Sequence, residues 1–564
     1  MFSQMTNLLY VTAYLYDSAN RPLEHPEFSV EHLRTLSRQL SPSHLLIFVL
    51  KSGESAIREL LAPYSNVTIV PVTLDELWTW RTLGNTSYEL PTHRNLQKDT
   101  RDHLWRSHAC VELAYRATEL FTDSTHICWL NFTVPYLFSE PDETFAQLRA
   151  FAQWQLSPKM LAMPGCLSSG PSNHQTLTEQ ICWRFCGAVF CGDSQSIKEF
   201  YNTYCHELPP FLEAHQVLPW DVNFWAYLES QGNNIVQGAW YAGNHDDSIV
   251  VGLPHKYYTQ CLADTQSFCK TTYEYPAIAD MRPTSAAFLQ LQDGRRILNT
   301  RYVNYWLYAD GSYRYPSHEH VIENANMLCD IDDTWMPSDF RQMKENTGLT
   351  ETVGAYSRGL EDIRLYEYDG KIRCIATNVN YVNSGRNRMV LGNYCLVTGE
   401  ITDGRLLHPP QETWCEKNWI PVDYRGQEAF IYQWWPMHIG VLDEKDRLTI
   451  VREHKLTNPL FKRVRGSTLF LPQTSGSLIG VVHFSEEGSP RKYFHMLVEL
   501  ESESLMPIRF SQPFCFESLG IEFCIGFAFT EETYVFWISR MDRDPCMISV
   551  YKEELILSTY CIRE

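Results

Sequence analysis

The sequence lacks the features that mark several large classes of protein. It has no run of lysine and arginine longer than a few residues, and its net charge is −20 over 564 residues. Both facts argue against nucleic acid or an anionic membrane as the main partner. No apolar run approaches the roughly 18 residues of a membrane-spanning helix, and the first residues carry no basic stretch of the kind that opens a signal peptide. We therefore expect a cytoplasmic protein without a membrane span.

A repeated cysteine spacing is also missing. The 17 cysteines are scattered along the chain, which favours reduced thiols over a disulfide framework. In "ICWRFCGAVFCGDSQSIKEFY" (181–201) three cysteines, Cys182, Cys186 and Cys191, lie close in sequence, with no histidine among them and no second cysteine pair nearby. Structural zinc sites usually take two ligand pairs, so we favour buried thiols over a zinc site here.

What the first half of the chain does contain is an alternation of strand-like and helix-like segments. "NLLYVTAYLY" (7–16), "HLLIFVLK" (44–51) and "NVTIVPV" (66–72) are apolar runs typical of strands buried on both faces. A long helical pattern (100–121) leads into another strand, "HICWLNFTV" (126–134). This pattern predicts a mostly parallel α/β sheet, and ligands of such sheets bind beyond the carboxyl ends of the strands.

The pattern of predicted secondary structure changes at about residue 283. Short strands then recur between Gly, Asp and Asn turns, and long helical patterns are nearly absent. About 280 residues of this kind predict a β-propeller, with five blades at roughly 50 residues per blade. The sequence therefore predicts two domains, at 1–255 and 283–564, joined by a connector at 256–282.

Motifs in the first half resemble one known family. "PGC" (164–166), "WRFCGAVFCGDSQSIKEFY" (183–201), "LPWDVNFWAYLE" (218–229) and "WYAGNHDDSIV" (240–250) are similar in order and spacing to motifs of the HtrL/YibB-like family. The resemblance implies that residues 1–255 form a GT-A-like, nucleotide-sugar-binding glycosyltransferase domain. Such a domain would move a hexose from a nucleotide-sugar donor to a glycan acceptor.

The chemistry of that reaction suggests which residues would take part. The donor diphosphate is usually held through Mg²⁺ or Mn²⁺ by carboxylates, and the acceptor hydroxyl needs a general base. We expect Asp221 to act as that base and His245 with Asp246 to hold the metal or the diphosphate. Arg184 could pair with phosphate oxygens, although Arg184 and Asp193 could equally pair or cap a helix. The predicted substrate-binding residues of this half are Arg184, Asn131, Asn223, Trp220 and Asp247, and the predicted metal ligands are Asp246, His245 and Asn131.

One position departs from the family pattern. The family usually carries an acidic residue at the end of the strand where this sequence has "WLNF", with Asn131 in that place. An asparagine oxygen can bind Mg²⁺, but it brings no charge. This difference favours weakened or metal-independent activity.

The second half resembles another family. "GLEDIRLYEYDGKIRCIATNVNY" (359–381) is similar to the Glu-Asp-Pro-Arg blade motif of glycoside hydrolase family 130, with Ile363 in the proline position. The segments 466–486, 491–529 and 534–544 resemble the closing blades of that family. The resemblance implies a five-bladed propeller with a central sugar-binding pocket, as in mannoside phosphorylases and hydrolases.

The residues of that pocket are only partly retained. Glu361 and Asp362 are the catalytic candidates, but Asn418 stands in "WCEKNWIPV" (414–422) where the family carries its acid, and an amide cannot donate a proton as a carboxylic acid does. Asp362 and Arg364 could instead tie blades together, and one of Trp434 or Trp435 could stack on a sugar. The predicted substrate-binding residues are Arg364, Asn418, Lys417, His483, Tyr493, Glu522 and Asp542; His495 and Glu517 are also retained.

Taken together, these observations predict an enzyme that transfers a hexose from a nucleotide sugar to an oligosaccharide or glycan, using Mn²⁺ or Mg²⁺. The propeller would hold the glycan or act on it in a second reaction. Two alternatives stay open. The protein could be a glycan-binding or scaffold protein whose domains have lost catalysis, or the propeller could be a mannoside phosphorylase or hydrolase.

Overall fold

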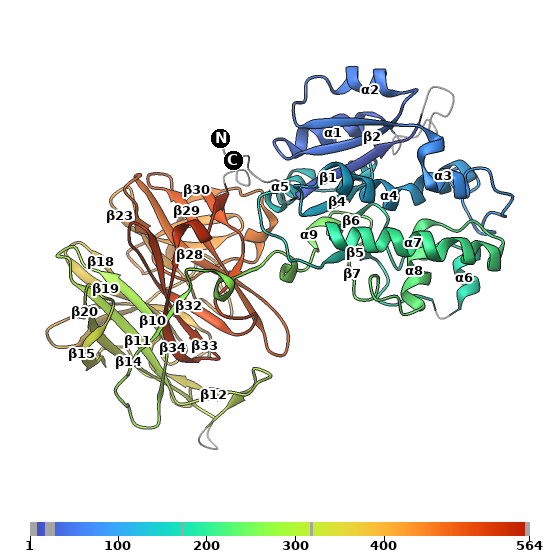
Figure 1. Ribbon diagram of the computed structural model, residues 1–564. Coiled ribbons are helices and arrows are strands. Elements are labelled where there is room, and N and C mark those ends of the chain that lie inside the picture. Colours follow the sequence, from blue (N-terminus) through green and yellow to red (C-terminus); the bar gives the residue numbers. More distant parts are fainter. Residues whose placement is uncertain (1–7, 17–28, 172, 316–319, 559–564) are drawn as a thin grey trace. The chain divides into compact units, whose positions relative to one another are not determined.

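The computed structural model describes residues 8–16, 29–171, 173–315 and 320–558. The chain divides into two compact units, Met1–Tyr258 and Thr259–Glu564, and Figure 1 shows helices around a sheet in the first and strands in the second. Among the described residues no helix combines the length and the apolar character that crossing a membrane requires.

The first unit is built on one seven-stranded sheet with the order β3-β2-β1-β4-β6-β5-β7. Its strands are β1 (Leu8–Tyr14), β2 (Leu45–Leu50), β3 (Val67–Val72), β4 (His126–Leu130), β5 (Leu161–Gly165), β6 (Val189–Asp193) and β7 (Trp240–Ala242). Its α-helices are α1 (Glu31–Leu40), α2 (Glu54–Leu61), α3 (Trp78–Leu83), α4 (Arg101–Leu120), α5 (Pro141–Phe151), α6 (His174–Glu179), α7 (Ser194–His215), α8 (Asp221–Ser230) and α9 (Ser248–Val251).

The sheet is mixed, and its parallel part confirms the predicted α/β class. Strands β3, β2, β1 and β4 run parallel, whereas β6 is antiparallel to both of its neighbours, β4 and β5. The residues of β2 and β4 are buried along their whole length, as the continuous apolar runs in the sequence predict.

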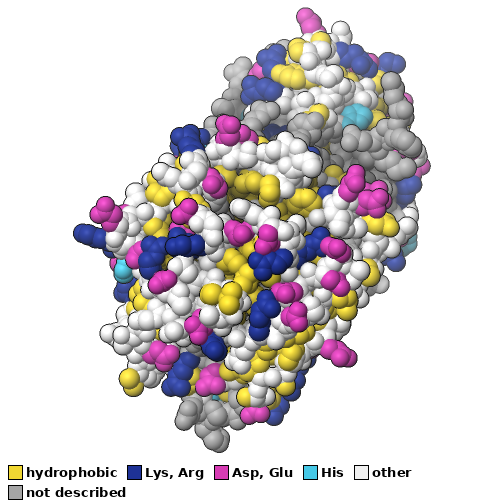
Figure 2. All heavy atoms as spheres, turned by 90° about the vertical axis from the view of Figure 1, so that its left-hand side faces the viewer, with side chains coloured by type: hydrophobic (Ala, Val, Ile, Leu, Met, Phe, Trp, Pro, Cys, Tyr) yellow, Lys and Arg dark blue, Asp and Glu magenta, His cyan; other side chains and the backbone are white. Residues whose placement is uncertain are grey.

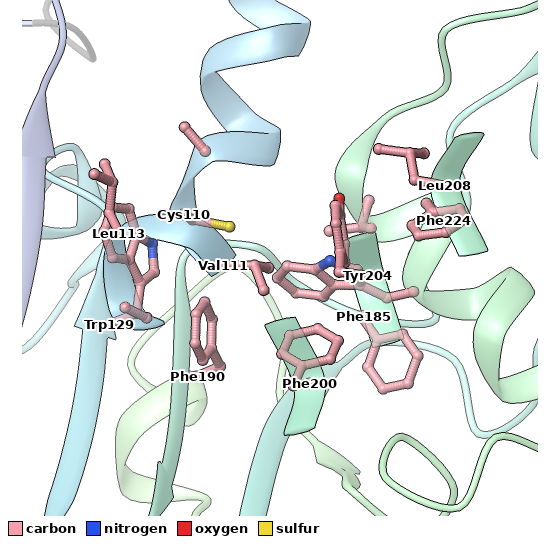
Figure 3. Close-up of a cluster of buried hydrophobic side chains, with 14 of the residues drawn as sticks. Cys110, Val111, Leu113, Trp129, Phe185, Phe190, Phe200, Tyr204, Leu208 and Phe224 are labelled. Atoms are coloured by element: carbon pink, nitrogen blue, oxygen red, sulfur yellow. The ribbon is translucent and has the colours of Figure 1, made fainter. Parts of the chain in front are cut away.

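Helices α4, α7 and α8 cover part of this sheet through a large aromatic core. Phe190 of β6 packs edge-on against Trp225 of α8, with ring centroids 5.8 Å apart, and Phe200 of α7 packs 6.0 Å from the same tryptophan. Figure 3 shows this cluster, in which Val111 of α4 and Phe185 also point toward the centre. The packing fixes the start of α8, where Asp221 lies, relative to the sheet.

The order of the strands creates a topological switch point at the middle of the sheet, between β1 and β4. From β1 the chain moves outward through β2 to β3 and then returns to place β4 on the other side of β1. The connections that leave the carboxyl ends of β1 and β4 therefore diverge. In open α/β sheets this topological switch point is where ligands bind.

The described residues of the second unit form six sheets: five of them are the blades of a β-propeller, and the sixth is a pair of short strands. Strand β10 packs against β18 of one neighbouring blade and β32 of the other. The blades are β10 (Arg282–Gln290), β11 (Arg296–Val303), β14 (Ile322–Ile331) and β15 (Pro337–Gln342); β18 (Glu361–Tyr368), β19 (Lys371–Asn378), β20 (Arg388–Cys395) and β21 (Glu400–Leu406); β22 (Ile420–Tyr424), β23 (Gln427–Trp434), β24 (Met437–Leu442) and β25 (Leu448–His454); β26 (Arg465–Gly466) and β27 (Leu471–Pro472) beside β28 (Ser477–Glu486), β29 (Lys492–Glu501) and β30 (Pro507–Ser511); and β32 (Glu522–Phe529), β33 (Thr533–Arg540), β34 (Arg543–Tyr551) and β9 (Cys269–Thr272).

Short strands extend these sheets. They are β16 (Lys344–Glu345) on β21, β17 (Ser357–Arg358) on β14, β31 (Phe514–Cys515) between β29 and β8 (Gln260–Cys261), and β35 (Leu557–Ser558) on β30. Strands β12 (Trp306–Leu307) and β13 (Tyr313–Arg314) form a separate pair. Figure 2 shows one face of the propeller, where acidic and basic side chains are interspersed and neither sign covers a large area.

Most of the segment predicted as a connector, 256–282, belongs to the second unit, which begins at Thr259. Its strand β9 pairs with β34 and supplies the outer strand of the last blade, and its strand β8 pairs with β31. The physical reason is that β9, from the beginning of the unit, completes the last blade by backbone hydrogen bonds to β34, and this pairing ties the two ends of the unit together and closes the ring of blades. The boundary between the units accordingly lies after Tyr258.

The loops at one end of the sheet pack closely around Gly165, the last residue of β5. A Cβ atom placed there would lie 1.8 Å from the carbonyl oxygen of Arg184, so the backbone would have to move apart. We expect Gly165→Ala to lower the free energy of unfolding of the first unit by about 1–3 kcal/mol or more. Urea unfolding followed by tryptophan fluorescence measures this loss. Gly170→Ala is the matched control, because the nearest atom to its Cβ would be 3.9 Å away; equal stability of the two variants would contradict the prediction.

Candidate functional sites

The first unit has a cavity of about 420 Å³ at the switch point of its sheet. Leu15 and Tyr16, which follow β1, form one wall, and Asn131, Phe132 and Thr133, which follow β4, form another. The cavity therefore lies beyond the carboxyl ends of the two strands that the sequence singles out.

The structure brings four of the predicted residues to this cavity. Asn131, Trp220, Asp221 and His245 all line it, although they come from three separate regions of the chain. The side-chain oxygen of Asn131 accepts hydrogen bonds from the backbone and the hydroxyl of Thr133, each at 3.1 Å. This side chain therefore organises the loop after β4 as well as facing the cavity.

A group of basic residues lines the same cavity, and the sequence analysis did not single it out. Lys98 and Arg106 are among its members, together with His93 and His103. The Arg106 Nε donates to the carbonyl oxygen of Leu15 at 2.7 Å, and its guanidinium lies 4.6 Å from the centre of the Tyr16 ring. The available signal was the density of basic and polar residues in "HRNLQKDTRDHLWR" (93–106), just before and within the first turns of α4.

Asp221 is the most perturbed acid at this cavity. It is the first residue of α8 and its side chain is buried. Burial raises the pKa of Asp221 to about 6, although hydrogen bonds from the Val222 backbone and from Ser107 oppose the shift. A carboxyl group with a pKa close to neutral can accept a proton from an acceptor hydroxyl and release it again, which is the behaviour required of a general base.

The remaining predicted residues of this unit make contacts within the fold. Arg184 forms a two-pronged ion pair with Glu229, at 2.7 and 2.6 Å, and lies 4.5 Å from the ring of Trp240. Asp193 caps α7 and does not pair with Arg184, since its carboxylate accepts from the Gln195 and Ser196 backbones at 3.1 Å. The interpretation of Asp193 as a helix cap is confirmed.

Asn223 and the acidic pair Asp246–Asp247 are also engaged. The amide of Asn223 accepts from the Cys182 backbone at 2.7 Å and donates to the carbonyl oxygens of Leu177 and Gln180, each at 2.8 Å. Asp246 accepts from the backbone of Ser248 at 2.8 Å. Asp247 accepts from the Thr144 hydroxyl at 2.6 Å and from the Ser139 backbone at 2.9 Å, which ties α9 to α5.

The three predicted metal ligands, Asn131, His245 and Asp246, form a poor cage for a hard cation. Mg²⁺ and Mn²⁺ prefer carboxylate and carbonyl oxygens. Of the three predicted ligands, Asn131 and His245 bring no carboxylate, and an oxygen of Asp246 is held by Ser248. The Mg²⁺ or Mn²⁺ expected from the sequence remains a prediction that these side chains support weakly.

The propeller has a cavity of about 300 Å³ between the segment that precedes β22, the end of β23 and strand β26. Lys417 and Asn418 line it together with Arg465, and Tyr432 and Trp434 supply aromatic surface. Glu416 also borders this cavity, because residues 411–419 precede β22 and do not follow strand alternation. Its carboxylate is occupied by the Trp419 indole, at 2.8 Å.

Arg364 connects three blades at this place. Its side chain is buried, and it donates to the carbonyl oxygen of Ser467 at 2.6 Å and to the amide oxygen of Asn418 at 3.3 Å. Burial lowers the pKa of Arg364 to about 10, and the negative charge of Asp362 opposes that shift. The guanidinium therefore remains charged at neutral pH, and these contacts favour the alternative in which Arg364 ties blades together.

Asp362 and Glu361 face a different arginine. The Arg301 guanidinium of β11 lies 3.0 Å from Asp362 and 3.7 Å from Glu361. Asp542 joins this group through a hydrogen bond of 3.0 Å from the Tyr305 hydroxyl, and burial raises the pKa of Asp542 despite the nearby Arg301. Three carboxylates thus surround one arginine on the inner part of the propeller.

His483 lies near the positively charged residues Lys417 and Arg465 of the cavity. It is buried and forms a hydrogen bond of 2.9 Å with the hydroxyl of Ser467. Burial lowers the pKa of His483 well below its usual range, and the positive charges of Arg364, Arg465 and Lys417 lower it further. Its ring is therefore neutral at pH 7.

The other predicted propeller residues take structural positions. Tyr493 stacks against His483 at 6.0 Å between ring centroids. Glu522 accepts backbone hydrogen bonds from the loop before β32, the shortest of them 2.7 Å from Phe516. Glu517 pairs with Lys270 of β9 at 2.7 Å and so helps to close the ring. His495 is buried, and burial lowers its pKa to about 3.

Comparisons with known proteins find similarity in structure only. No family model matches the sequence, and no curated protein matches it. A β-1,2-mannobiose phosphorylase from Listeria innocua is similar in structure, with 11% identity, a TM-score of 0.35 and coverage of 51% of this chain and 97% of that one.

Two further structures give a similar result. One belongs to the GH130 family of mannoside phosphorylases, described as containing glycoside hydrolases that target β-1,2 mannosidic linkages in Candida mannan; it shows 10% identity, a TM-score of 0.36 and coverage of 54% of this chain and 99% of that one. The other is a GDP-Man-dependent mannosyltransferase from Leishmania mexicana, with 11% identity, a TM-score of 0.35 and coverage of 50% and 90%. At this level of similarity, the strand pairing of the chain itself establishes the propeller.

The raised pKa of Asp221 makes the stability of the first unit depend on pH. A carboxyl group that titrates near 6 when folded and near 3.8 when unfolded favours the folded state while it is protonated, so its contribution is lost as pH rises through this range. We expect Asp221→Asn to gain about 2–3 kcal/mol in free energy of unfolding relative to the natural protein between pH 4 and pH 7.

Urea unfolding at a series of pH values measures the difference. Asp123→Asn is the control, because Asp123 is exposed before β4. A constant stability difference between Asp221→Asn and the natural protein over this range would show that Asp221 titrates normally.

Proposed function

We propose that this protein is a carbohydrate-active protein whose β-propeller binds a mannose-type glycan in the cavity beside Asn418, without the acid-catalysed step of phosphorolysis. The observation that carries the proposal is the position of Asn418. It lines the cavity, and its amide oxygen is held by Arg364. An amide at that position cannot supply the proton that a departing glycosidic oxygen requires.

The surroundings of Asn418 suit a sugar and its phosphate. Tyr432 gives the cavity an aromatic surface on which the apolar face of a sugar ring can pack, while Trp434 lines the cavity but is buried. Lys417 and Arg465 are exposed at the same cavity and can pair with a phosphate group. The resemblance to mannoside phosphorylases supports the same class of ligand. The two experiments below distinguish a propeller that only binds the sugar from one in which a group other than Asn418 catalyses its cleavage.

The first test is thermal unfolding of the full chain with β-1,2-mannobiose and with mannose 1-phosphate. A ligand present at 100 times its Kd stabilises the folded state by about 2.7 kcal/mol, so millimolar sugar reveals weak binding. We expect both compounds to raise the Tm, and we expect Lys417→Met with Arg465→Met to abolish the shift with mannose 1-phosphate only. Lys455→Met, an exposed lysine outside this cavity, is the control. Absence of any shift would contradict the proposal.

The role of Asn418 has a separate test. We expect the natural protein to release no mannose 1-phosphate from β-1,2-mannobiose in the presence of inorganic phosphate. Asn418→Asp places a carboxyl group beside Arg364 and is expected to give measurable phosphorolysis. Release by the natural protein would show that another group supplies the proton, and would overturn the non-catalytic part of the proposal while leaving sugar binding intact.

A second candidate function concerns the first unit. We infer that its cavity binds a nucleotide sugar, because Lys98 provides a cation for a diphosphate, Arg106 lines the same cavity while paired with Asp102, and Asp221 provides a base with a pKa of about 6. The HtrL/YibB-like resemblance supports glycosyl transfer from such a donor. Asp221 would accept the proton of the attacking hydroxyl, and the cationic side chains would stabilise the departing diphosphate.

This second function predicts stabilisation by one nucleotide sugar. We expect one of a set of UDP-, GDP- and CMP-linked sugars to raise the Tm of the full chain, and Lys98→Met to weaken its binding at least about tenfold through the lost charge-assisted contact. Lys51→Met, an exposed lysine away from the cavity, should bind as the natural protein does. If no donor shifts the Tm, with or without Mn²⁺, the transferase function fails and glycan binding by the propeller remains the proposed function.

A further inference from the structure

Three side chains of the types that bind metal ions, two cysteines and a histidine, lie close together at one end of the strands of the first unit's sheet. Cys166 follows β5, Cys186 precedes β6, and His245 lies between β7 and α9. The Cys166 Sγ lies 3.8 Å from the Cys186 Sγ and 3.7 Å from the Nδ1 of His245. One ligand atom from each residue lies within 4.8 Å of the other two.

The topology of the sheet accounts for this meeting. Strands β5 and β7 are parallel, and β6 is antiparallel to β5. The two ends that follow β5 and β7 and the beginning of β6 therefore lie on the same edge. Sequence spacing does not reveal this arrangement, because the three residues are 20 and 59 positions apart in the chain.

Backbone contacts fix the two cysteines beside each other. The Cys186 N–H donates to the carbonyl oxygen of Pro164 at 2.7 Å, and the Cys166 N–H donates to that of Trp183 at 3.0 Å. Gly165 allows this approach, since any Cβ there would overlap the carbonyl oxygen of Arg184. The two cysteines are therefore held together by backbone contacts, and the His245 ring reaches Cys166 from the loop after β7.

The two distances from the Cys166 Sγ match those of a tetrahedral zinc centre. With Zn–S bonds of about 2.3 Å and Zn–N bonds of about 2.0–2.1 Å, tetrahedral geometry places two thiolate sulfurs about 3.8 Å apart and a sulfur and an imidazole nitrogen about 3.6 Å apart. The observed separations are 3.8 and 3.7 Å. Thiolate and imidazole are also the ligands that zinc prefers over Mg²⁺ and Mn²⁺.

We propose that Cys166, Cys186 and His245 bind a zinc ion with three protein ligands. Three protein ligands and one open position are typical of zinc sites that act on a ligand, whereas structural sites usually have four. His245 also lines the 420 Å³ cavity, so the metal would lie at the wall of that cavity. An anionic group of a molecule bound there would be the natural fourth ligand.

This site differs from the predicted magnesium or manganese site in its ligands. It shares His245 with that prediction but uses two cysteines in place of Asn131 and Asp246. It also does not use the trio at 182, 186 and 191: all three are buried, as expected, and only Cys186 joins the cluster. The proposal concerns metal binding in the first unit and is independent of sugar binding by the propeller.

Metal content and cobalt spectroscopy test the proposal without an activity assay. The full chain is kept reduced with a phosphine, loaded with Zn²⁺ or Co²⁺ and dialysed, and its metal content is measured by mass spectrometry. We expect one metal ion per chain that resists dialysis, and for Co²⁺ a thiolate-to-metal charge-transfer band in the near ultraviolet together with intense visible bands of tetrahedral cobalt.

Variants identify the ligands. We expect Cys166→Ser, Cys186→Ser and His245→Ala each to lower the affinity for Zn²⁺ at least about 100-fold and to change or remove the cobalt bands. Cys182→Ser is the control for a buried cysteine of the same segment, and Cys269→Ser for an exposed one; both should bind as the natural protein does. Circular dichroism shows whether each variant is folded, and Cys166→Ser, at an exposed position, serves if Cys186→Ser does not fold.

Two results would overturn the proposal. One is a natural protein that retains no more zinc or cobalt than Cys166→Ser and His245→Ala. The other is a Cys166–Cys186 disulfide, detected by peptide mapping, that forms equally fast with and without excess Zn²⁺, because bound zinc would protect both thiolates from oxidation.

Discussion

The pairing of β1 with β2 on one side and β4 on the other is the constraint on which the first unit depends. These parallel pairs bury the middle of the sheet and require the chain to cross from β3 back to β4. The crossing separates the loops after β1 and β4 and leaves a cavity between them. Aromatic packing of α7 and α8 on β6 then sets Asp221 at that cavity. The candidate chemistry of this unit follows from the order of its strands.

The propeller depends on closure in the same way. A blade becomes stable when its inner strand packs against those of its neighbours, and the last blade is completed by β9, which comes from the beginning of the unit. The charged side chains on the inner part of the propeller serve this closure. Arg364 joins its own blade to Ser467 and Asn418, and Arg301 joins its blade to Asp362. A ligand in the propeller cavity beside Asn418 would therefore contact charged groups whose positions are already fixed by the contacts between blades.

Several residues that attracted attention in the sequence turned out to be held by the fold. Arg184 has the charge to bind a phosphate, and Asp247 has the charge to bind a metal ion that holds a phosphate. Both charges are instead used in contacts that join separate elements of the fold. A buried charge needs a partner whether or not it takes part in function. Sequence motifs rich in Arg and Asp can therefore mark either a functional site or a structural ion pair. Asp221 differs because burial raises its pKa and it borders a cavity.

The sequence by itself determined the class of each unit, because continuous apolar runs and recurring short strands reflect local periodicity and burial. It indicated that the ends of β1 and β4 matter, and it indicated Asn131, Asp221 and His245. Only the tertiary structure decided the rest. The separation between two side chains from distant segments depends on sheet order and on close backbone approaches such as the one at Gly165. For that reason only the fold decided that Lys98 and Arg106 line the cavity. It also decided that β9 closes the propeller and that Cys166 meets Cys186 and His245.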